Sequence, residues 1–197
     1  MSNSTRIAVL FASSNRHKTA EIQALLGERF IVNDISGMDG FQPPEENGAT
    51  FEANALIKAE AAASHASIPV IADDSGLEVD ALSGAPGIHT ARFAGINATD
   101  RQNREKLIAS LSGQTNRNAR FVCVLALIKP GHPAKLFRGE IRGSIALAES
   151  GRGGFGYDPL FVPAGCSESF AELAPEIKNT LSHRAVAVQK LLLSGIL

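Results

Sequence analysis

The sequence has little excess of either charge. Its 197 residues include 19 Lys and Arg against 20 Asp and Glu, which gives a formal net charge of −1, and the two signs are mixed along the chain. A large basic field of the kind that holds a nucleic-acid backbone is therefore absent. We expect no nucleic-acid partner, and a small-molecule ligand is favoured instead.

Long hydrophobic runs are also missing. The first apolar run, residues 7–12, is shorter than the core of a signal peptide, and no later stretch approaches the length that spans a bilayer. We expect neither export nor a membrane partner. The two cysteines, Cys123 and Cys166, lack the spacing of a metal site and are typical of reduced thiols. These features predict a cytoplasmic protein.

Repeats, linkers and low-complexity segments are absent as well. Hydrophobic residues make up 44% of the chain and charged residues 20%, which places it among folded globular proteins and away from disordered ones. A chain of 197 residues is also long enough to bury a substantial core. We therefore predict a single domain that spans residues 1–197.

Short apolar runs predict strands, and strong helix formers or apolar residues at helical spacing predict helices. The run 121–127 is apolar on both alternating faces, so we expect a central strand that is covered on both sides. The predicted strands are 6–12, 30–35, 69–72, 78–82, 119–128, 135–148 and 159–162. The predicted helices are 18–30, 50–66, 99–111 and a last helix after Ser182.

Two pairs of carboxylates suggest a metal site. Glu45 and Glu46 lie in the Gly- and Pro-rich loop 37–48, and Asp73 and Asp74 follow a predicted strand, with a Ser-Gly turn after them. Oxygen ligands of this kind suit Mg²⁺ that is bridged to phosphates. An acidic pair seen alone is more often a solvated turn. Asp74 is the stronger candidate, because an apolar strand would hold it rigidly at the sheet edge.

Two lysines are candidates for phosphate contacts. Lys18 follows the polar connection between the first predicted strand and helix, where backbone N–H groups and the helix dipole favour an anion. Asn54 and Lys58 are four residues apart on a predicted helix and share one face. Solvated surface positions are the alternative for both lysines. The P-loop pattern is absent, which disfavours a P-loop kinase or GTPase.

Two later segments could contact a base. In the Gly-rich segment 153–158, Phe155 and Tyr157 can offer flat apolar surfaces, and Asp158 can accept hydrogen bonds from ring N–H groups. At the start of the last predicted helix, Arg184 has several fixed donors that suit a carbonyl oxygen. Taken singly, segment 153–158 is more typical of a Gly-rich hairpin without a ligand. Residues 182–184 could be only a helix cap followed by surface residues.

Taken together and in this order, the segments resemble the inosine triphosphate pyrophosphatase family, also described as the purine dITP/XTP pyrophosphatases. The resemblance spans nearly the whole chain, and six ordered matches are far more specific than any one of them. The matching segments are 13–18, Glu46 with 50–55, 72–77, 84–88, 153–159, and Lys178 with 182–184.

The resemblance implies an elongated, two-lobed α/β fold, with a long central mixed β-sheet flanked by helices and a nucleotide cleft between the lobes. It also implies a homodimer. The implied activity is Mg²⁺-dependent hydrolysis of ITP, dITP and XTP to the nucleoside monophosphate and pyrophosphate, by attack of water on the α-phosphorus. Such an activity removes deaminated purines from the nucleotide pool.

The resemblance also implies roles for single residues. Glu46 and Asp74 would hold Mg²⁺, Asp74 would accept the proton of the attacking water, and Lys18 and Lys58 would compensate the triphosphate charge. Phe155 would stack on the purine, and Arg184 would favour a C6 carbonyl over the amino group of adenine. The full set of implied substrate contacts is Ser13, Ser14, Asn15, Arg16, His17, Lys18, Ser75, Phe155, Gly156, Tyr157, Asp158, Lys178, His183 and Arg184.

The first motif departs from the commonest form of the family, which is Thr-Gly-Asn. Ser14 stands at the glycine position of that motif, and His17 occupies a position that is often glycine. A glycine would tolerate a positive φ and close approach to phosphate better than serine does. Asn15 and Lys18 are in place, so we keep the predicted phosphate site.

Three other functions remain as alternatives. The first is a pyrophosphatase for modified pyrimidine triphosphates on a related fold, which a substrate panel would distinguish. The second is a nucleotide-binding sensor without catalysis, which would be expected to lack Glu46 or Asp74. The third is a scaffold whose acidic turns are merely solvated.

Overall fold

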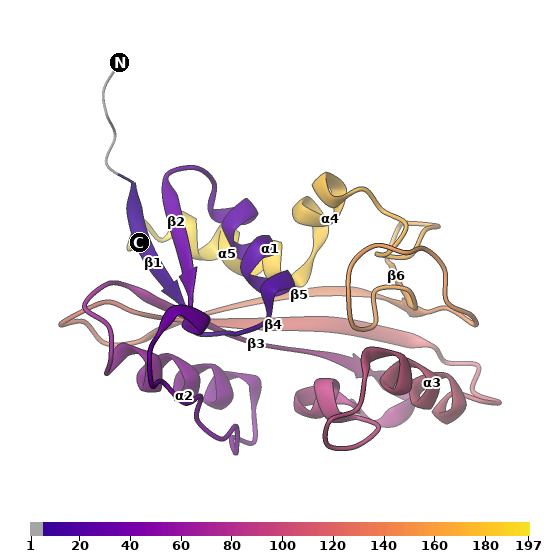
Figure 1. Ribbon diagram of the computed structural model, residues 1–197. Helices are drawn as coiled ribbons and strands as arrows, with labels where there is room; N and C mark the ends of the chain where they lie inside the picture. The colour runs from indigo at the N-terminus through magenta and orange to yellow at the C-terminus, as the bar shows by residue number, and fades with distance from the viewer. Residues whose placement is uncertain (1–5) are drawn as a thin grey trace. The chain divides into compact units, whose positions relative to one another are not determined.

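In the computed structural model, which describes residues 6–197, six strands form one mixed sheet in the order β2-β1-β3-β4-β5-β6 (Figure 1). β1 pairs in parallel with β2 and with β3, whereas β6 is antiparallel to β5. The predicted α/β class with a mixed sheet is confirmed. The strands are β1 (Ile7–Phe11), β2 (Phe30–Asp34), β3 (Val70–Val79), β4 (Asn118–Ile128), β5 (Lys135–Ile145) and β6 (Phe161–Pro163).

The helices α1, α2 and α3 each follow a residue whose side chain satisfies a free backbone donor. Asn15, Thr50 and Thr99 each accept a hydrogen bond from a backbone N–H in the first turn of the helix that follows. The α-helices are α1 (Arg16–Leu26), α2 (Phe51–Ala63), α3 (Asp100–Ser110), α4 (Pro175–Leu181) and α5 (His183–Leu193). Three 3₁₀ helices, η1 (Ile35–Gly37), η2 (Asp80–Leu82) and η3 (Gly87–Arg92), lie between them.

The four predicted helices are confirmed, but α4 was not predicted. It is only seven residues long, and its larger apolar side chains, Ile177 and Leu181, are 48% and 37% exposed. A helix this short that buries no apolar stripe leaves no periodic signal in the sequence. α1 also ends before the predicted boundary, because Gly27 adopts a φ of 79° and stops it there.

The region around Asp73 and Asp74 corrects the predicted turn. One continuous strand, β3, runs from Val70 through both acids to Val79. Its pairing with β1 ends at the contact of Phe11 with Ile71, so the acids lie just beyond the end of β1 rather than at the end of their own strand. Sheet pairing therefore overrides the local turn preference of the Asp-Asp-Ser-Gly string.

The chain divides into two compact units. Unit 1 contains the described residues up to Asp74, together with Cys123–Gly139 and Arg184–Leu197, and unit 2 contains Ser75–Val122 and Glu140–His183. Each unit has its own apolar cluster. In unit 1, Phe11, Ile22 and Val188 bring β1, α1 and α5 together, whereas Leu107 and Phe161 belong to the cluster of unit 2.

β4 lies inside the sheet, between β3 and β5. In β4, Val122, Cys123, Val124, Leu125 and Ala126 are fully buried, which confirms a strand covered on both sides. The two cysteines are not joined in a disulfide. Within residues 6–197, no helix has the length and apolar character needed to cross a membrane. Residues 1–5, which the predicted domain 1–197 includes, lie outside the described part of the chain.

Candidate active site

Asp74 is the centre of an acidic and basic cluster in unit 1. Its side chain comes from β3 and is 9% exposed. Oδ1 lies 2.9 Å from Lys58 Nζ, and Oδ2 accepts a hydrogen bond of 3.3 Å from Asn54 Nδ2. Asn54 and Lys58 both belong to α2, so the prediction that they share one face of a helix is confirmed. One turn of α2 thus fixes both oxygens of the carboxylate.

Glu46 reaches the same cluster from the long loop before α2. Its Oε1 lies 3.1 Å from Lys58 Nζ, so this ammonium group bridges Glu46 and Asp74. The loop is tied to α2, because the N–H of Gly48 donates to Asn54 Oδ1 at 2.8 Å. A Cβ at Gly48 would lie 2.6 Å from that oxygen and 2.8 Å from the Ala53 Cβ, so this close approach requires glycine.

The charges in this cluster shift the titration of both partners. Burial raises the pKa of Asp74 above its usual value, and the positive charge of Lys58 offsets this only in part. Burial lowers the pKa of Lys58, but the carboxylates of Asp74, Asp73 and Glu46 outweigh it and hold this pKa above its usual value. Lys58 therefore stays charged near neutral pH, beside a carboxylate that is more basic than usual.

Asp73 points to the opposite face of β3, as adjacent strand residues do. Its Oδ1 lies 3.0 Å from Lys18 Nζ of α1, and its Oδ2 accepts a hydrogen bond of 3.1 Å from Arg184 Nη2 of α5. α1 and α5 lie on one side of the sheet and α2 on the other (Figure 1). The two neighbouring acids therefore receive their cations from different helical layers.

Arg184 is buried in this second layer. Its side chain is 2% exposed, and it hydrogen-bonds to Asp73 and to Glu21 of α1. Burial opposes the charged form of Arg184, but the carboxylates of Asp73 and Glu21 outweigh this and raise its pKa. The contribution of Glu21 was missed by sequence analysis. Its position three residues after Lys18 on a helix gives no signal that distinguishes it from a solvated glutamate.

The first loop of the chain presents the predicted phosphate-binding residues. Asn15 Oδ1 accepts hydrogen bonds from the backbone N–H groups of His17 and Lys18, at 3.0 and 3.2 Å, and caps α1. Ser14 does not adopt a positive φ, since the non-glycine residues of 6–197 that do so are Ser83 and Asn97. The serine at this glycine position is therefore not strained.

A cavity of about 130 Å³ joins this loop to the acidic cluster. Its lining brings together several residues that the sequence places far apart, among them the predicted phosphate contacts Ser13, Ser14, Lys18 and Lys58. The lining residues are Ala12, Ser13, Ser14, Lys18, Ile35, Phe41, Pro43, Pro44, Glu46 and Lys58.

A second cluster, in unit 2, is built around Asp158. Its Oδ2 accepts hydrogen bonds from the Phe155 N–H at 2.9 Å and from Lys178 Nζ at 2.7 Å. The ammonium group of Lys178 also lies 5.3 Å from the centre of the Phe155 ring. Gly154 has a φ of 69°, and a Cβ there would lie 2.0 Å from Asp158 Oδ2. The Gly-rich segment therefore wraps closely around this carboxylate.

The aromatic and helix-cap candidates of unit 2 differ in exposure. Tyr157 is 2% exposed and belongs to the apolar core, where its hydroxyl donates to the Thr90 carbonyl at 3.0 Å. Burial raises the pKa of this phenol, and the charge of Asp100 adds to the effect. His183 is 5% exposed and stacks on Phe121, with the ring centres 4.7 Å apart. Phe155 is only half-buried.

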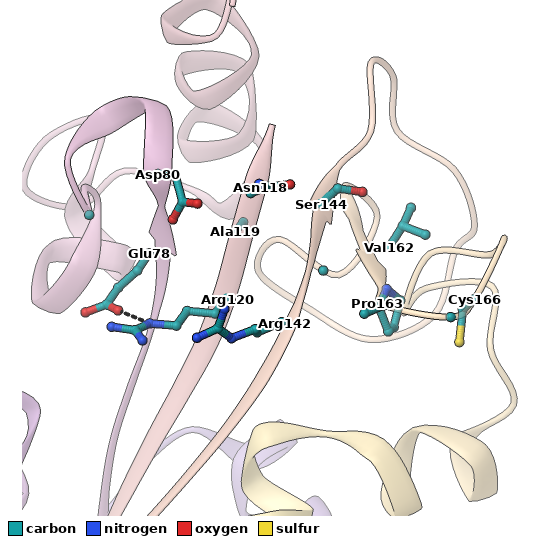
Figure 2. A pocket seen from close by; sticks show the side chains of 14 residues that line it. Glu78, Asp80, Asn118, Ala119, Arg120, Arg142, Ser144, Val162, Pro163 and Cys166 are labelled. Atoms are coloured by element: carbon teal, nitrogen blue, oxygen red, sulfur yellow. Dashed lines mark hydrogen bonds and ion pairs between the residues drawn. The ribbon is translucent and has the colours of Figure 1, made fainter. Parts of the chain in front are cut away.

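A larger hollow of about 640 Å³ in unit 2 contains none of the residues predicted from the sequence (Figure 2). Arg120 lies along it and donates from Nε to Glu78 Oε2 at 2.6 Å. The same guanidinium lies 3.6 Å from Glu140. Its charge is thus directed at carboxylates of unit 2.

The sequence that forms these clusters matches a known protein family. The sequence model of the Ham1 family matches residues 9–193. This chain belongs to the Ham1 family. The match covers every site residue predicted from the sequence, from Ser13 to Arg184, and the predicted family resemblance is confirmed.

Relatives within the Ham1 family agree along almost their whole length. The dITP/XTP pyrophosphatase of Exiguobacterium sp. is 44% identical over 93% of this chain and 94% of its own. The structure of the Staphylococcus aureus Ham1 protein is 42% identical, with a TM-score of 0.85 over 95% of this chain and 98% of its own. A HAM1 protein from Coxiella burnetii is 37% identical, with a TM-score of 0.86 over 96% and 99%.

Proposed function

We propose that this chain hydrolyses ITP, dITP and XTP to the nucleoside monophosphate and pyrophosphate. The observation that carries the proposal is the buried Asp74 held by Lys58 and Asn54, in a chain 44% identical to a dITP/XTP pyrophosphatase. A sensor without catalysis has no need of a buried carboxylate with a raised pKa beside a charged lysine. Solvated acidic turns are excluded, because Asp73 and Asp74 are both buried.

The triphosphate is the part of the substrate that unit 1 suits. Ser13, Ser14, Lys18 and Lys58 line one cavity, and both lysines are held in place by carboxylates of β3. Two ammonium groups supply positive charge, and the serine hydroxyls supply donors for phosphate oxygens. Asn15 orders the loop by capping α1, and Arg16 and His17 follow it in the first turn.

The carboxylates of Glu46 and Asp74 fit a divalent cation. Glu46 Oε1 and Asp74 Oδ1 both lie within hydrogen-bonding distance of Lys58 Nζ, so the two carboxylates lie close together. Mg²⁺ takes hard oxygen ligands and usually keeps only one or two carboxylates beside substrate phosphates. Residues 6–197 hold no group of three or more His, Cys, Asp and Glu that could bind a metal, so water and substrate phosphates would have to supply the other ligands. When bound, Mg²⁺ would supply positive charge next to the phosphates.

Asp74 is the group best suited to move a proton. Hydrolysis requires water to attack the α-phosphorus while the β-phosphate oxygen leaves. Burial raises the pKa of Asp74, which makes its carboxylate a stronger base, and the charge of Lys58 opposes this shift in part. Asn54 fixes the second oxygen and thereby the direction of the first. Lys18 and Lys58 then stabilise charge on the phosphate oxygens.

Purine recognition is assigned to residues of unit 2 and to Arg184. Phe155 offers a half-buried ring for stacking, with Lys178 and Asp158 beside it. Arg184 would donate a hydrogen bond to the C6 oxygen of hypoxanthine or xanthine. A guanidinium has five N–H donors, so it can bind carboxylates and a ligand oxygen at the same time. The remaining proposed contacts come from Ser75, Gly156, Tyr157 and His183.

The family resemblance supports further proposals about the whole protein. We propose one pyrophosphatase domain over residues 1–197, a homodimer, Mg²⁺ as cofactor and a cytoplasmic location, without nucleic-acid or membrane partners. Sedimentation at micromolar concentration should report the dimer. A fully active monomer would remove the argument for a functional dimer.

Pyrophosphate release tests the proposed function directly. The purified chain should release pyrophosphate from ITP, dITP and XTP when Mg²⁺ is present, and lose this activity when the ion is chelated. ATP and modified pyrimidine triphosphates should be poor substrates. A preference for pyrimidine triphosphates would instead support the alternative on a related fold, and release of orthophosphate alone would contradict attack at the α-phosphorus.

A further inference from the structure

Both backbone polar groups of Gly156, in the Gly-rich segment, are held by α3. The N–H of Gly156 donates to Asp100 Oδ2 at 2.7 Å, and the carbonyl of Gly156 accepts from Arg104 Nη1 at 2.9 Å. Asp100 and Arg104 are four residues apart on α3, so their side chains share one face of the helix. We call this pair with Gly156 the α3 clamp. Sequence analysis assigned neither of the two α3 residues a role.

The clamp acts on a backbone that is otherwise permissive. Gly156 has a φ of 60°, and glycines at this and nearby positions lower the cost of moving the loop. Phe155 lies between two fixed points, because its own N–H is bound by Asp158 and the next residue is bound by α3. The backbone from which the Phe155 ring projects is thereby held on both sides.

The clamp is itself supported. Arg104 Nε lies 2.9 Å from Glu149 Oε1, and the Arg104 side chain is 16% exposed. Asp100 lies in the first turn of α3, where the helix dipole stabilises a carboxylate. Each of the two hydrogen bonds to Gly156 has a charged partner, which makes it stronger than a neutral hydrogen bond.

We infer that Asp100 and Arg104 are positioning residues that hold Phe155 and Asp158 in the geometry needed to bind the purine. This inference rests on the proposed function, because it assumes that Phe155 and Asp158 contact the base. Pre-ordering a loop removes an entropy cost from binding, so its loss should weaken base recognition without changing contacts to phosphate.

The test compares substrates with and without a base. Asp100→Ala and Arg104→Met should each raise KM for dITP about five- to tenfold, while kcat changes little. This is less than the roughly ten- to a hundredfold loss of a direct hydrogen bond with a charged group, because the two side chains act on the base through the loop. Inhibition by inorganic tripolyphosphate, which has no base, should be unchanged. Asp100→Asn and Arg104→Lys, which keep an acceptor and a donor, should recover most of the loss.

Two further measurements separate positioning from a merely structural role. The double variant should lose less than the product of the two single losses, because both side chains hold the same residue, Gly156. Hydrogen exchange of segment 153–158 should accelerate in the alanine and methionine variants. Arg101→Met is the matched control: this arginine lies on the same helix, is 80% exposed, pairs with Glu105 and should change neither readout.

The outcomes distinguish the two proposals. If the unaltered chain releases no pyrophosphate from dITP, the proposed function fails, while hydrogen exchange still decides whether α3 holds the loop. The positioning role is wrong if the chain is active but the clamp variants weaken inhibition by tripolyphosphate as much as they raise KM for dITP. It is also wrong if these variants leave both KM for dITP and hydrogen exchange of segment 153–158 unchanged.

Discussion

The two charged clusters of the molecule use carboxylates in different ways. In unit 1, Asp73 and Asp74 on one strand each meet cations from helices, and Lys18 and Lys58 also line a cavity. In unit 2, Asp158 is bound by one lysine and one backbone N–H inside a closely wrapped glycine loop. The ion pairs of unit 1 place charged side chains beside a cavity, whereas the bonds to Asp158 fix the conformation of segment 153–158.

This difference predicts different consequences of substitution. In unit 1, changes at Asp74, Lys18 and Lys58 should affect all nucleotides alike, because every triphosphate has the same phosphates. Changes in the unit 2 cluster should depend on the base. Substitutions in each cluster, and one at a separate ion pair, test this comparison.

The largest effect is expected at Asp74. Asp74→Asn keeps the size of the side chain but removes the proton acceptor, so kcat should fall by about 10²- to 10⁴-fold for every substrate. Thermal unfolding and much of the nucleotide affinity should be preserved. Near-wild-type kcat at saturating Mg²⁺ would contradict the assignment.

Lys178→Met should affect stability and base recognition together. It leaves the buried carboxylate of Asp158 without its cation, which should lower the free energy of unfolding by about 3–5 kcal/mol. The double variant Asp158→Asn/Lys178→Met removes the charge as well and should regain most of this stability, as measured by denaturant unfolding. It should not regain the preference for dITP over dATP. Recovery of that preference would show that the ion pair has only a structural role.

Arg184→Ala and Lys18→Ala form a matched pair of tests within unit 1. If Arg184 donates to the C6 oxygen, its loss should lower kcat/KM for ITP by about ten- to a hundredfold and reduce the ratio of ITP to ATP. Lys18→Ala should weaken all nucleotides about equally and leave this ratio unchanged. Because Arg184 also holds Asp73 and Glu21, unfolding must be measured in parallel, at a temperature where the variant is folded. A parallel loss for both substrates would place Arg184 with the phosphate cluster.

The smallest effect is expected at Glu52, which lies away from both clusters. Burial raises the pKa of this carboxyl, but a backbone hydrogen bond and Arg138 outweigh it and hold the pKa below its usual value. A lowered folded pKa stabilises the protein above the unfolded pKa of about 4.3, and this contribution is lost as the pH falls through the folded value. Glu52→Gln should therefore lower Tm slightly at pH 7 and converge with the unaltered chain near pH 3. A constant difference in Tm would contradict this.

Most local structure could be predicted from the sequence, because helix formers, caps and apolar runs act over a few residues. Thr50 and Thr99, for example, cap the two helices that the composition predicts. The prediction of a turn at Asp73 and Asp74 was wrong, because pairing with strands distant in the sequence continues β3 through both residues. Such pairing has no signal within the string itself.

The site residues could be predicted only in part. The sequence placed Asn54 and Lys58 on one helix face, and the structure brings them to Asp74. Glu21, Asp100 and Arg104 were missed, because their partners lie far away in the chain and surface glutamates and arginines are common. Tyr157 was expected to offer an exposed ring, but the ring lies in the core. Alternation in a glycine loop does not reveal which side chain turns inward.

The opposite directions of Asp73 and Asp74 along β3 have a consequence for mutational scanning. Replacing one acid alters one helical layer, and the other can retain its partners. Adding or deleting a single residue between Val70 and Asp73 would instead exchange the faces of both acids, because side chains alternate with a period of two. Substitutions along this strand should therefore give graded losses of activity. Single-residue insertions and deletions there should abolish it at each position.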